Sequence, residues 1–154
     1  MDAEDDGSEF VAFYEREYLP QVRRALLLTG SEVVAEDVVH QAFTAVWDRW
    51  DSIDQPGAYL NRCVINAIRD HQRGQVRDRA VVALSSGEGA VSAEPPEFLS
   101  DVLMELPLNQ RAVIVLRYFG GLRDVEIAAA LDCPEGSVGP WARRALDTLE
   151  RELR

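Results

Sequence analysis

The 154-residue chain contains no lysine, few cysteines and no long uninterrupted apolar run. A bilayer-spanning helix needs about 20 apolar residues, and here polar residues interrupt every hydrophobic stretch well before that length. The chain begins MDAEDDGSEF, which is acidic, whereas a secretory signal peptide begins with basic residues and continues with apolar ones. These features predict a soluble, cytoplasmic protein with no membrane insertion.

The scarcity of cysteine argues against two kinds of small-domain scaffold. Cys63 and Cys133 lie far apart in the sequence, outside any CxxC motif and with no histidine cluster nearby. This arrangement supports neither a disulfide framework nor a zinc module. Both thiols are expected to be small buried hydrophobic groups, and no metal or cofactor is expected.

Signatures of catalysis are missing as well. His40 and His71 are isolated, and the chain has no nucleophile elbow, Walker loop or dinucleotide-binding glycine motif. The adjacent carboxylates of Glu36 and Asp37 would point about 100° apart on a helix, so they would not converge on one reacting group. The chain is therefore expected not to be an enzyme.

The formal net charge of −11 comes mainly from two segments. Residues 1–17 contain seven acidic residues and one arginine, and residues 80–110 contain five acidic residues and no arginine. Residues 18–79 and 111–154 are each neutral, so the net charge alone does not exclude a nucleic-acid-binding role. All 16 basic residues are arginines, which GC-rich coding explains more readily than a need for bidentate phosphate recognition.

Helical periodicity is nearly continuous and no strand-like alternation persists, so the fold class is predicted to be all-α. The expected architecture is two small helical domains joined by a flexible acidic linker, the C-terminal one a helix-turn-helix. The predicted divisions are an acidic tail at 1–9, a first domain at 10–79, a linker at 80–97 and a second domain at 98–154. Helices are expected at about 10–28, 31–50, 58–73, 98–105, 109–118, 123–131 and 138–153.

Local signals mark several helix ends. Gly30 is a C-cap candidate for the first helix, and Ser31 is a good N-cap for the second. A tight turn at residues 132–136 separates two helices, and Asp132 occupies the position where a left-handed conformation is usual. A helical hairpin with no role in DNA binding has the same pattern, and that alternative stays open.

The predicted helix at 58–73 has a polar stripe. On a helical wheel Arg62, Asn66, Arg69 and Arg73 fall within about 60° of one another, opposite the apolar residues. Guanidinium and amide groups in one line can follow a phosphate backbone or single-stranded bases. Such a stripe is also typical of the solvated face of an amphipathic helix, and periodicity alone favours that simpler interpretation.

Short motifs occur in order along both neutral blocks. The first block contains AEDVVHQAF at 35–43 followed by Trp47, then YLNR at 59–62 followed by Asn66 and Asp70. The second contains LP at 106–107, QR at 110–111, LRY at 116–118, EIA at 126–128, GSV at 136–138 and RAL at 144–146. The first set resembles region two, and the second region four, of bacterial RNA polymerase sigma factors of the extracytoplasmic-function group.

The resemblance implies an alternative sigma factor that binds core RNA polymerase and promoter DNA and directs transcription initiation. In that family region two docks on the clamp helices of the largest polymerase subunit, and its following loop and helix capture bases of the melted minus-ten element. Region four recognises the minus-thirty-five element, and the linker passes near the active-site cleft. An anti-sigma factor is a further partner that the resemblance suggests.

The resemblance also implies roles for individual residues. The implied polymerase-binding residues are Asp37, His40, Gln41, Phe43 and Trp47. The implied minus-ten residues are Asp54, Tyr59, Asn61, Arg62, Asn66, Arg69 and Arg73. The implied minus-thirty-five residues are Ser137, Trp141, Arg143 and Arg144.

The chain departs from the family pattern in both blocks. His40 stands where the family usually has glutamine, and the sequence VGPW at 138–141 replaces the usual Val-Lys-Ser-Arg of the recognition helix. Pro140 is disfavoured inside a helix, so Ser137 is expected to be the N-cap, which places Pro140 in the first turn. Two alternatives stay open: a sigma-like regulatory protein that binds polymerase or an anti-sigma partner with weakened or altered DNA recognition, and an unrelated helix-turn-helix repressor.

Overall fold

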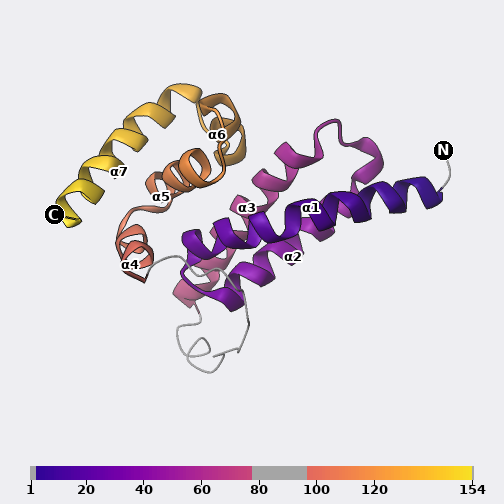
Figure 1. Ribbon diagram of the computed structural model, residues 1–154, viewed down its shortest axis with the longest axis horizontal. Helices are drawn as coiled ribbons and strands as arrows, with labels where there is room; N and C mark the ends of the chain where they lie inside the picture. The colour runs from indigo at the N-terminus through magenta and orange to yellow at the C-terminus, as the bar shows by residue number, and fades with distance from the viewer. Residues whose placement is uncertain (1–2, 78–96, 154) are drawn as a thin grey trace.

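The computed structural model describes residues 3–77 and 97–153, and within these ranges the chain forms helices and no strands (Figure 1). The elements are α1 (Ala3–Thr29), α2 (Glu32–Asp48), η1 (Trp50–Ser52), α3 (Pro56–Arg77), α4 (Glu97–Glu105), α5 (Leu108–Ile114), η3 (Val115–Phe119), α6 (Asp124–Leu131), η4 (Glu135–Ser137) and α7 (Val138–Glu152). The prediction of an all-α fold with two helical domains is confirmed. The predicted linker at 80–97 lies outside the described residues except at its last position, where α4 begins. No helix in the described ranges is long and apolar enough to cross a bilayer.

The N-terminal domain consists of α1, α2 and α3 packed around one apolar core. Helix α2 contributes a buried stripe at helical spacing: Ala35, Val38, Val39, Ala42, Phe43 and Val46. The turn between α1 and α2 follows the predicted chemistry. Gly30 has φ +72° and donates its N–H to the Leu26 carbonyl at 2.8 Å, and the Ser31 hydroxyl accepts from the Val34 N–H at 3.3 Å. Both predicted caps are thereby confirmed.

Helix α1 begins at Ala3, earlier than the predicted start at Phe10. Gly7 and Ser8 have modest helix propensity, which is why the pattern favoured a later start. The ring of Phe10 packs against α2 and η1, 4.8 Å from the Trp47 ring and 5.3 Å from the Trp50 ring. Once tertiary contacts hold this turn, extending the helix toward the N-terminus costs little free energy.

The C-terminal domain packs α5, α6 and α7 around a second part of the core. Pro107 precedes α5, and Asp132 ends α6 in the left-handed conformation with φ 54°, as predicted. The predicted helix at 109–118 changes hydrogen-bond pattern after Ile114, because η3 is π-helical and the Gly120 N–H donates to the Val115 carbonyl at 3.0 Å. Such wide turns are uncommon in regular helices and frequent at functional positions.

Arg111 is a buried charge that connects the two domains. Its side chain is 4% exposed and donates to the carbonyls of Leu103 and Leu106 at 2.8 Å each, and also to the Leu28 carbonyl at the end of α1. Burial lowers the pKa of this guanidinium. Charge-assisted bonds to these helix-terminal carbonyls satisfy acceptors that would otherwise be buried without donors.

We expect Arg111→Met to lower the free energy of unfolding by about 3 kcal/mol, because it leaves several buried carbonyls without a donor. Urea unfolding of the full chain measures the change. Arg123→Met is the matched control: Arg123 lies on the surface, paired with Glu126 at 3.1 Å, and its loss should cost less than about 1 kcal/mol. Equal losses in the two variants would contradict the role assigned to Arg111.

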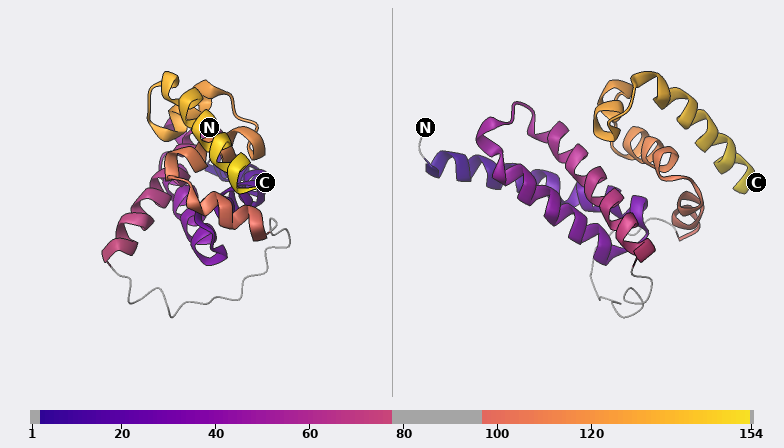
Figure 2. Two further views of the ribbon diagram at one scale, coloured as in Figure 1. Left: turned by 90° about the vertical axis from the view of Figure 1, so that its left-hand side faces the viewer. Right: turned by 180° about the vertical axis from the view of Figure 1, so that it is seen from behind.

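The two domains lie against each other, as the views in Figure 2 show. Helix α3 packs on α6, and the C-terminal half of α1 packs on α4 and η3. Gly30 faces Met104 closely, since a Cβ atom at Gly30 would lie 3.3 Å from the Met104 side chain. Residues from both domains therefore share one interface.

Candidate functional site

The exposed face of α2 brings together most of the residues predicted to bind polymerase. Asp37, His40, Gln41 and Trp47 are exposed there. The Gln41 amide donates to the Asp37 carboxylate at 2.9 Å, and the His40 imidazole lies 3.4 Å from the Tyr18 hydroxyl. These contacts orient polar side chains along one face of the helix.

Beside these polar groups, α1 and α2 form an apolar groove. This aromatic groove, of about 250 Å³, is lined by Phe10, Tyr14, His40, Phe43, Thr44 and Trp47. The Trp47 side chain is 49% exposed, and its ring packs 4.8 Å from that of Phe10. An exposed aromatic beside ordered polar groups is typical of a protein-binding surface.

Phe43 is buried, unlike the other residues predicted to bind polymerase. It is only 3% exposed, and its ring packs 4.8 Å from Tyr14 and 5.9 Å from Phe13. It therefore forms the floor of the aromatic groove and belongs to the core. Sequence reasoning missed Phe10, Tyr14 and Thr44; the four-residue spacing of the two aromatics on α1 was the available signal.

The polar stripe of α3 is assembled as predicted, but the C-terminal domain contacts part of it. The Arg69 guanidinium donates to the Leu131 carbonyl at 2.9 Å and to the Asn109 side-chain oxygen at 3.3 Å. Arg62 lies 3.7 Å from the Asp132 carboxylate. We call these contacts together the interdomain contact.

The remaining stripe residues lie at the surface. Asn66 is exposed, and Arg73 pairs within its own helix with Asp70 at 3.3 Å. Asp54 is exposed in the loop before α3. These side chains leave one edge of the stripe accessible beside the interdomain contact.

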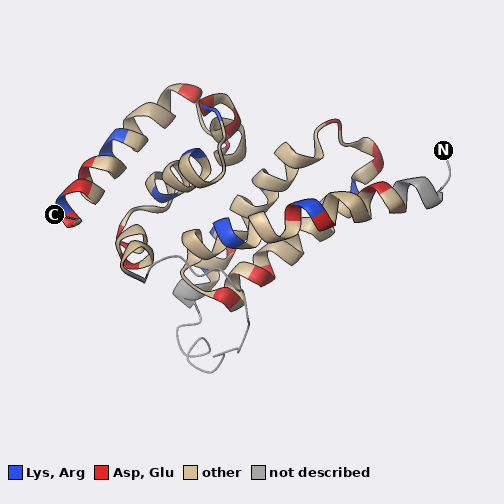
Figure 3. Cartoon of the chain, viewed as in Figure 1, with Lys and Arg blue, Asp and Glu red and all other residues tan. Residues whose placement is uncertain are grey.

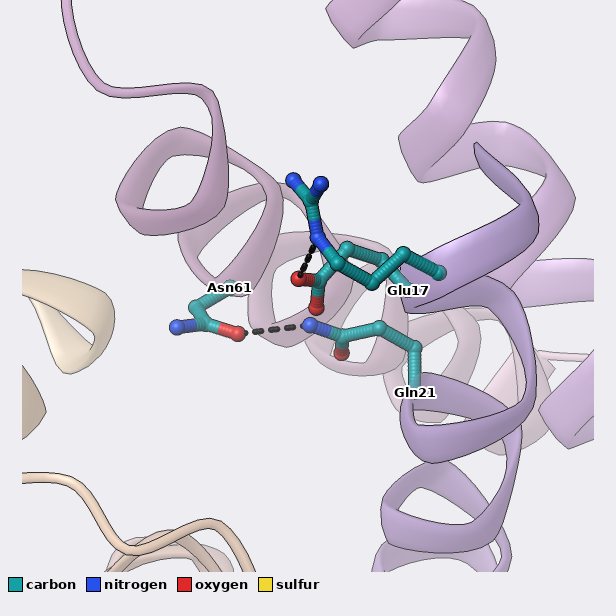
Figure 4. A network of polar contacts seen from close by, with 4 residues as sticks. Glu17, Gln21 and Asn61 are labelled. Carbon is teal, nitrogen blue, oxygen red and sulfur yellow. Dashed lines mark hydrogen bonds and ion pairs between the residues drawn. The ribbon is translucent and has the colours of Figure 1, made fainter. Parts of the chain in front are cut away.

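The other residues predicted to bind the minus-ten strand are tied to the N-terminal domain. The Asn61 side-chain oxygen accepts from the buried Gln21 amide at 2.7 Å, as Figure 4 shows with Glu17 beside them. Tyr59 is half-buried beside Cys63, and burial raises the pKa of both groups. Asn61 thus positions α3 against α1.

Neither cysteine is fully buried, although the sequence suggested that both would be. Cys63 and Cys133 are free and half-buried, packed against the edge of the core. Cys133 lies in the turn after α6, where Arg69 approaches it, and burial raises the pKa of its thiol. Turn residues have fewer neighbours than helix residues in the core, which accounts for the incomplete burial of Cys133, whereas Cys63 lies within α3 at the edge of its buried face.

The start of α7 confirms the predicted position of Pro140. Helix α7 begins at Val138 with Ser137 at the N-cap position, so Pro140 is in the first turn and exposed. The Ser137 side chain makes no capping bond, because η4 leads directly into α7 and holds Ser137 in helical conformation. Serine caps usually adopt an extended backbone instead.

The remaining residues of the predicted recognition helix are arranged on its two faces. Trp141 is half-buried against the core, and Arg143 and Arg144 are exposed. The rest of α7 carries three acidic residues, Asp147, Glu150 and Glu152, and one arginine, Arg151 (Figure 3). The exposed arginines supply phosphate-binding groups, but Gly139 and Pro140 offer no side-chain donor to base edges.

We expect Gly139→Lys combined with Pro140→Ser to change stability by less than about 1 kcal/mol, since neither residue lies in the helix interior. The added lysine should steepen the salt dependence of duplex binding by about 0.9 in log–log slope. Thermal unfolding and anisotropy titrations on a mixed-sequence duplex measure the two quantities on the full chain. A stability gain near 3 kcal/mol would contradict the first-turn placement of Pro140.

Comparison with known families matches both domains. Residues 15–78 match the family model described as Sigma-70 region 2, and residues 99–149 match Sigma-70, region 4. The RNA polymerase sigma-E factor of Streptomyces avermitilis is 31% identical over 139 residues, covering 86% of this chain and 78% of that protein. The ECF RNA polymerase sigma factor SigL of Mycobacterium tuberculosis is 30% identical over 158 residues, covering 92% and 89%.

Solved structures give the same result for the fold. CnrH, in complex with the cytosolic domain of CnrY, superposes with a TM-score of 0.70 at 26% identity, covering 94% of this chain and 86% of that one. The sigma factor RpoE of Bartonella quintana, in complex with the anti-sigma factor NepR, has a TM-score of 0.72 at 23% identity, covering 91% and 96%. At 23% identity, the similarity to RpoE supports the fold alone.

Proposed function

Because the chain belongs to the sigma-70 family of RNA polymerase sigma factors, in its extracytoplasmic-function group, we propose that its two domains divide promoter recognition between them. The chain is an alternative sigma factor that directs promoter recognition and transcription initiation. Residues 10–79 act as region two, 80–97 as the linker and 98–154 as region four. The presence of both regions in one chain carries this conclusion. It also removes the hypothesis of an unrelated helix-turn-helix repressor.

Region two binds core RNA polymerase through the exposed face of α2 and the aromatic groove. Trp47 is the apolar anchor, since a half-exposed indole buries a large area when a partner covers it. Asp37 and Gln41, already hydrogen-bonded to each other, present polar groups beside it. Phe43 supports this surface from below.

The stripe on α3 binds the melted promoter strand. Arg62, Arg69 and Arg73 supply cationic donors for phosphates, and Asn66 supplies an amide for base edges. Tyr59 and Asp54 lie at the start of the same surface. Asn61 acts indirectly, because its contact with Gln21 sets the orientation of α3.

Region four contributes a weaker or altered recognition of duplex DNA. Arg143 and Arg144 are exposed and can bind phosphates, with Ser137 and Trp141 on either side of the exposed Gly139-Pro140 step. Phosphate contacts position a protein on DNA without specifying a sequence. This feature favours a second candidate function: a sigma-like protein whose region four binds an anti-sigma partner more than it recognises a promoter.

The wider assignments follow from the same proposal. Its partners are core polymerase, promoter DNA and an anti-sigma factor, the kind of partner named for the RpoE neighbour. Its location is the cytoplasm, where the polymerase acts. Its role is to position the polymerase on promoter DNA, and the polymerase carries out the catalysis.

Binding of the full chain to bacterial core RNA polymerase tests this proposal. With a fluorophore at the N-terminus, fluorescence anisotropy should rise to saturation as core polymerase is added, and unlabelled chain should reverse it. An anisotropy that stays flat up to micromolar core polymerase would contradict the proposal. A saturable rise combined with failure to direct transcription would favour the second candidate function.

A further inference from the structure

A pocket between α1 and η3 has no part in the proposed function. It has a volume of about 260 Å³ and is lined by Pro20, Arg23, Arg24 and Leu27 from α1, and by Phe119 and Gly120 from the end of η3. It shares no lining residue with the aromatic groove, the stripe of α3 or the exposed part of α7. We call this cavity the arginine pocket.

The arginine pocket has positive charge that no carboxylate neutralises. Residues 18–29 of α1 include two arginines and no acidic residue, and Figure 3 shows this basic part of the helix in blue. Among the residues that the structure describes, neither Arg23 nor Arg24 forms an ion pair. The Glu17 carboxylate, which acts electrostatically on Arg24, is already paired with Arg16 at 3.3 Å. Two guanidiniums therefore line one cavity without a bound anion to balance them.

Arg24 loses solvation in this position. Its Nε donates to the Pro20 carbonyl at 3.3 Å, and its side chain is half-buried, which lowers its pKa. Glycine at position 120 makes room for it, because a Cβ atom there would lie 2.9 Å from Arg24 Nη1. A half-buried guanidinium without a counter-ion has given up water without gaining a charged partner. An anion bound in the pocket would supply that partner.

The remaining lining of the pocket is apolar and includes an exposed aromatic ring. Phe119 is 51% exposed although η3 packs against α1. It lies in a π-helical turn, a feature frequent at functional positions. Nucleobases stack on aromatic side chains, and guanidiniums bind phosphate oxygens through paired N–H donors. The lining thus matches a ligand that combines phosphate groups with a flat ring.

We propose that the arginine pocket binds a nucleoside diphosphate or triphosphate, with Arg23 and Arg24 on the phosphates and Phe119 stacked on the base. Pockets for small organic ligands usually measure about 300–1,000 Å³, so a cavity of about 260 Å³ leaves part of the nucleotide in solvent. The same volume argues against a protein partner, because a cavity that admits one side chain is far smaller than a stable protein interface. The inference goes beyond the proposed function and does not depend on it.

Calorimetric titration of the full chain with ADP, in a buffer free of divalent cations, tests this inference. ADP should bind with a dissociation constant of about 10–100 µM. Adenosine and pyrophosphate, which each have one of the two recognised groups, should bind about tenfold more weakly or worse. Absence of binding up to about 1 mM ADP would overturn the inference. Equal affinity for pyrophosphate and ADP would also overturn it, because the site would then recognise a bare anion.

A double variant locates the phosphate partners. Arg23→Gln combined with Arg24→Gln should weaken ADP binding by about 30-fold or more, since both guanidiniums are lost. The matched control combines Arg123→Gln with Arg151→Gln, which removes the same charge from exposed positions elsewhere and should bind ADP like the wild type. Equal weakening in the two double variants would show that ADP responds to overall charge, and the site would be rejected.

Phe119→Leu isolates the contribution of the aromatic ring. Because the ring is 51% exposed, an apolar replacement should leave the fold intact, and circular dichroism checks this. ADP should bind about fivefold more weakly to this variant, and the affinity for pyrophosphate should not change. If both ligands weakened equally, or neither weakened, Phe119 would not stack on a base and the assignment to nucleotides would be wrong.

Discussion

Replacing Arg62, Arg69 and Arg73 together with alanine should reduce open-complex formation by the holoenzyme by about 100-fold. Each arginine lost removes a phosphate or base contact, and contacts of this kind contribute on the order of 1 kcal/mol or more each. Affinity for core polymerase should change by less than about twofold, because the aromatic groove and α2 are untouched. Permanganate reactivity of promoter thymines measures the melting.

A matched triple variant separates this effect from a general loss of positive charge. Arg16, Arg123 and Arg151 are exposed and lie outside α3, and their replacement by alanine changes the net charge by the same amount. This control should melt the promoter normally. Full melting by the α3 variant would instead identify the stripe as the solvated face of an amphipathic helix.

The second large effect is expected at Trp47. Trp47→Ala should weaken binding to core polymerase by 30-fold or more, about 2 kcal/mol, because an aromatic anchor at the centre of an interface dominates its energy. Since the side chain is 49% exposed in the free chain, the folded state should lose less stability than it would on truncation of the buried Phe43 ring. Anisotropy titration with core polymerase gives the ratio of dissociation constants.

Two further variants define the specificity of that result. Val33→Ala removes an exposed apolar side chain from the same helix and should leave affinity unchanged. Phe43→Ala is unsuitable as a test of direct contact, because truncating this buried ring should cost roughly 3–5 kcal/mol of stability. If the Trp47 and Val33 variants bound core polymerase with equal affinity, the aromatic groove would not be part of the polymerase interface.

Helix ends that depend on local chemistry could be predicted from the sequence. Gly30, Ser31 and Asp132 each act through their own backbone conformation or side chain, so a short window contains the whole signal. The early start of α1 could not be predicted in this way, because contacts of Phe10 with α2 stabilise it. The π-helical turn at Val115–Phe119 also escaped prediction, since its residues have the same periodicity as an α-helix.

The sequence predicted which residues form the surfaces of the candidate site, but not which residues of the other domain contact those surfaces. The resemblance to the family indicated Asp37, Gln41 and Trp47, whereas the stripe of α3 followed from helical spacing. The contact of Arg69 with the end of α6 joins residues 62 positions apart, and no sequence pattern encodes such a pairing. The sequence showed Arg111 only as part of a motif. Its burial could not be predicted, because it depends on the backbone carbonyls that surround the guanidinium in the fold.

The most direct test of the central claim is transcription by the reconstituted holoenzyme. The full chain and bacterial core RNA polymerase are combined on a library of promoter fragments, and the 5′ ends of the transcripts are sequenced. The account predicts transcripts that start at defined positions downstream of a shared minus-ten element and that are absent with core polymerase alone. A transcript profile indistinguishable from that of core polymerase alone, under conditions where the chain is bound, would contradict it.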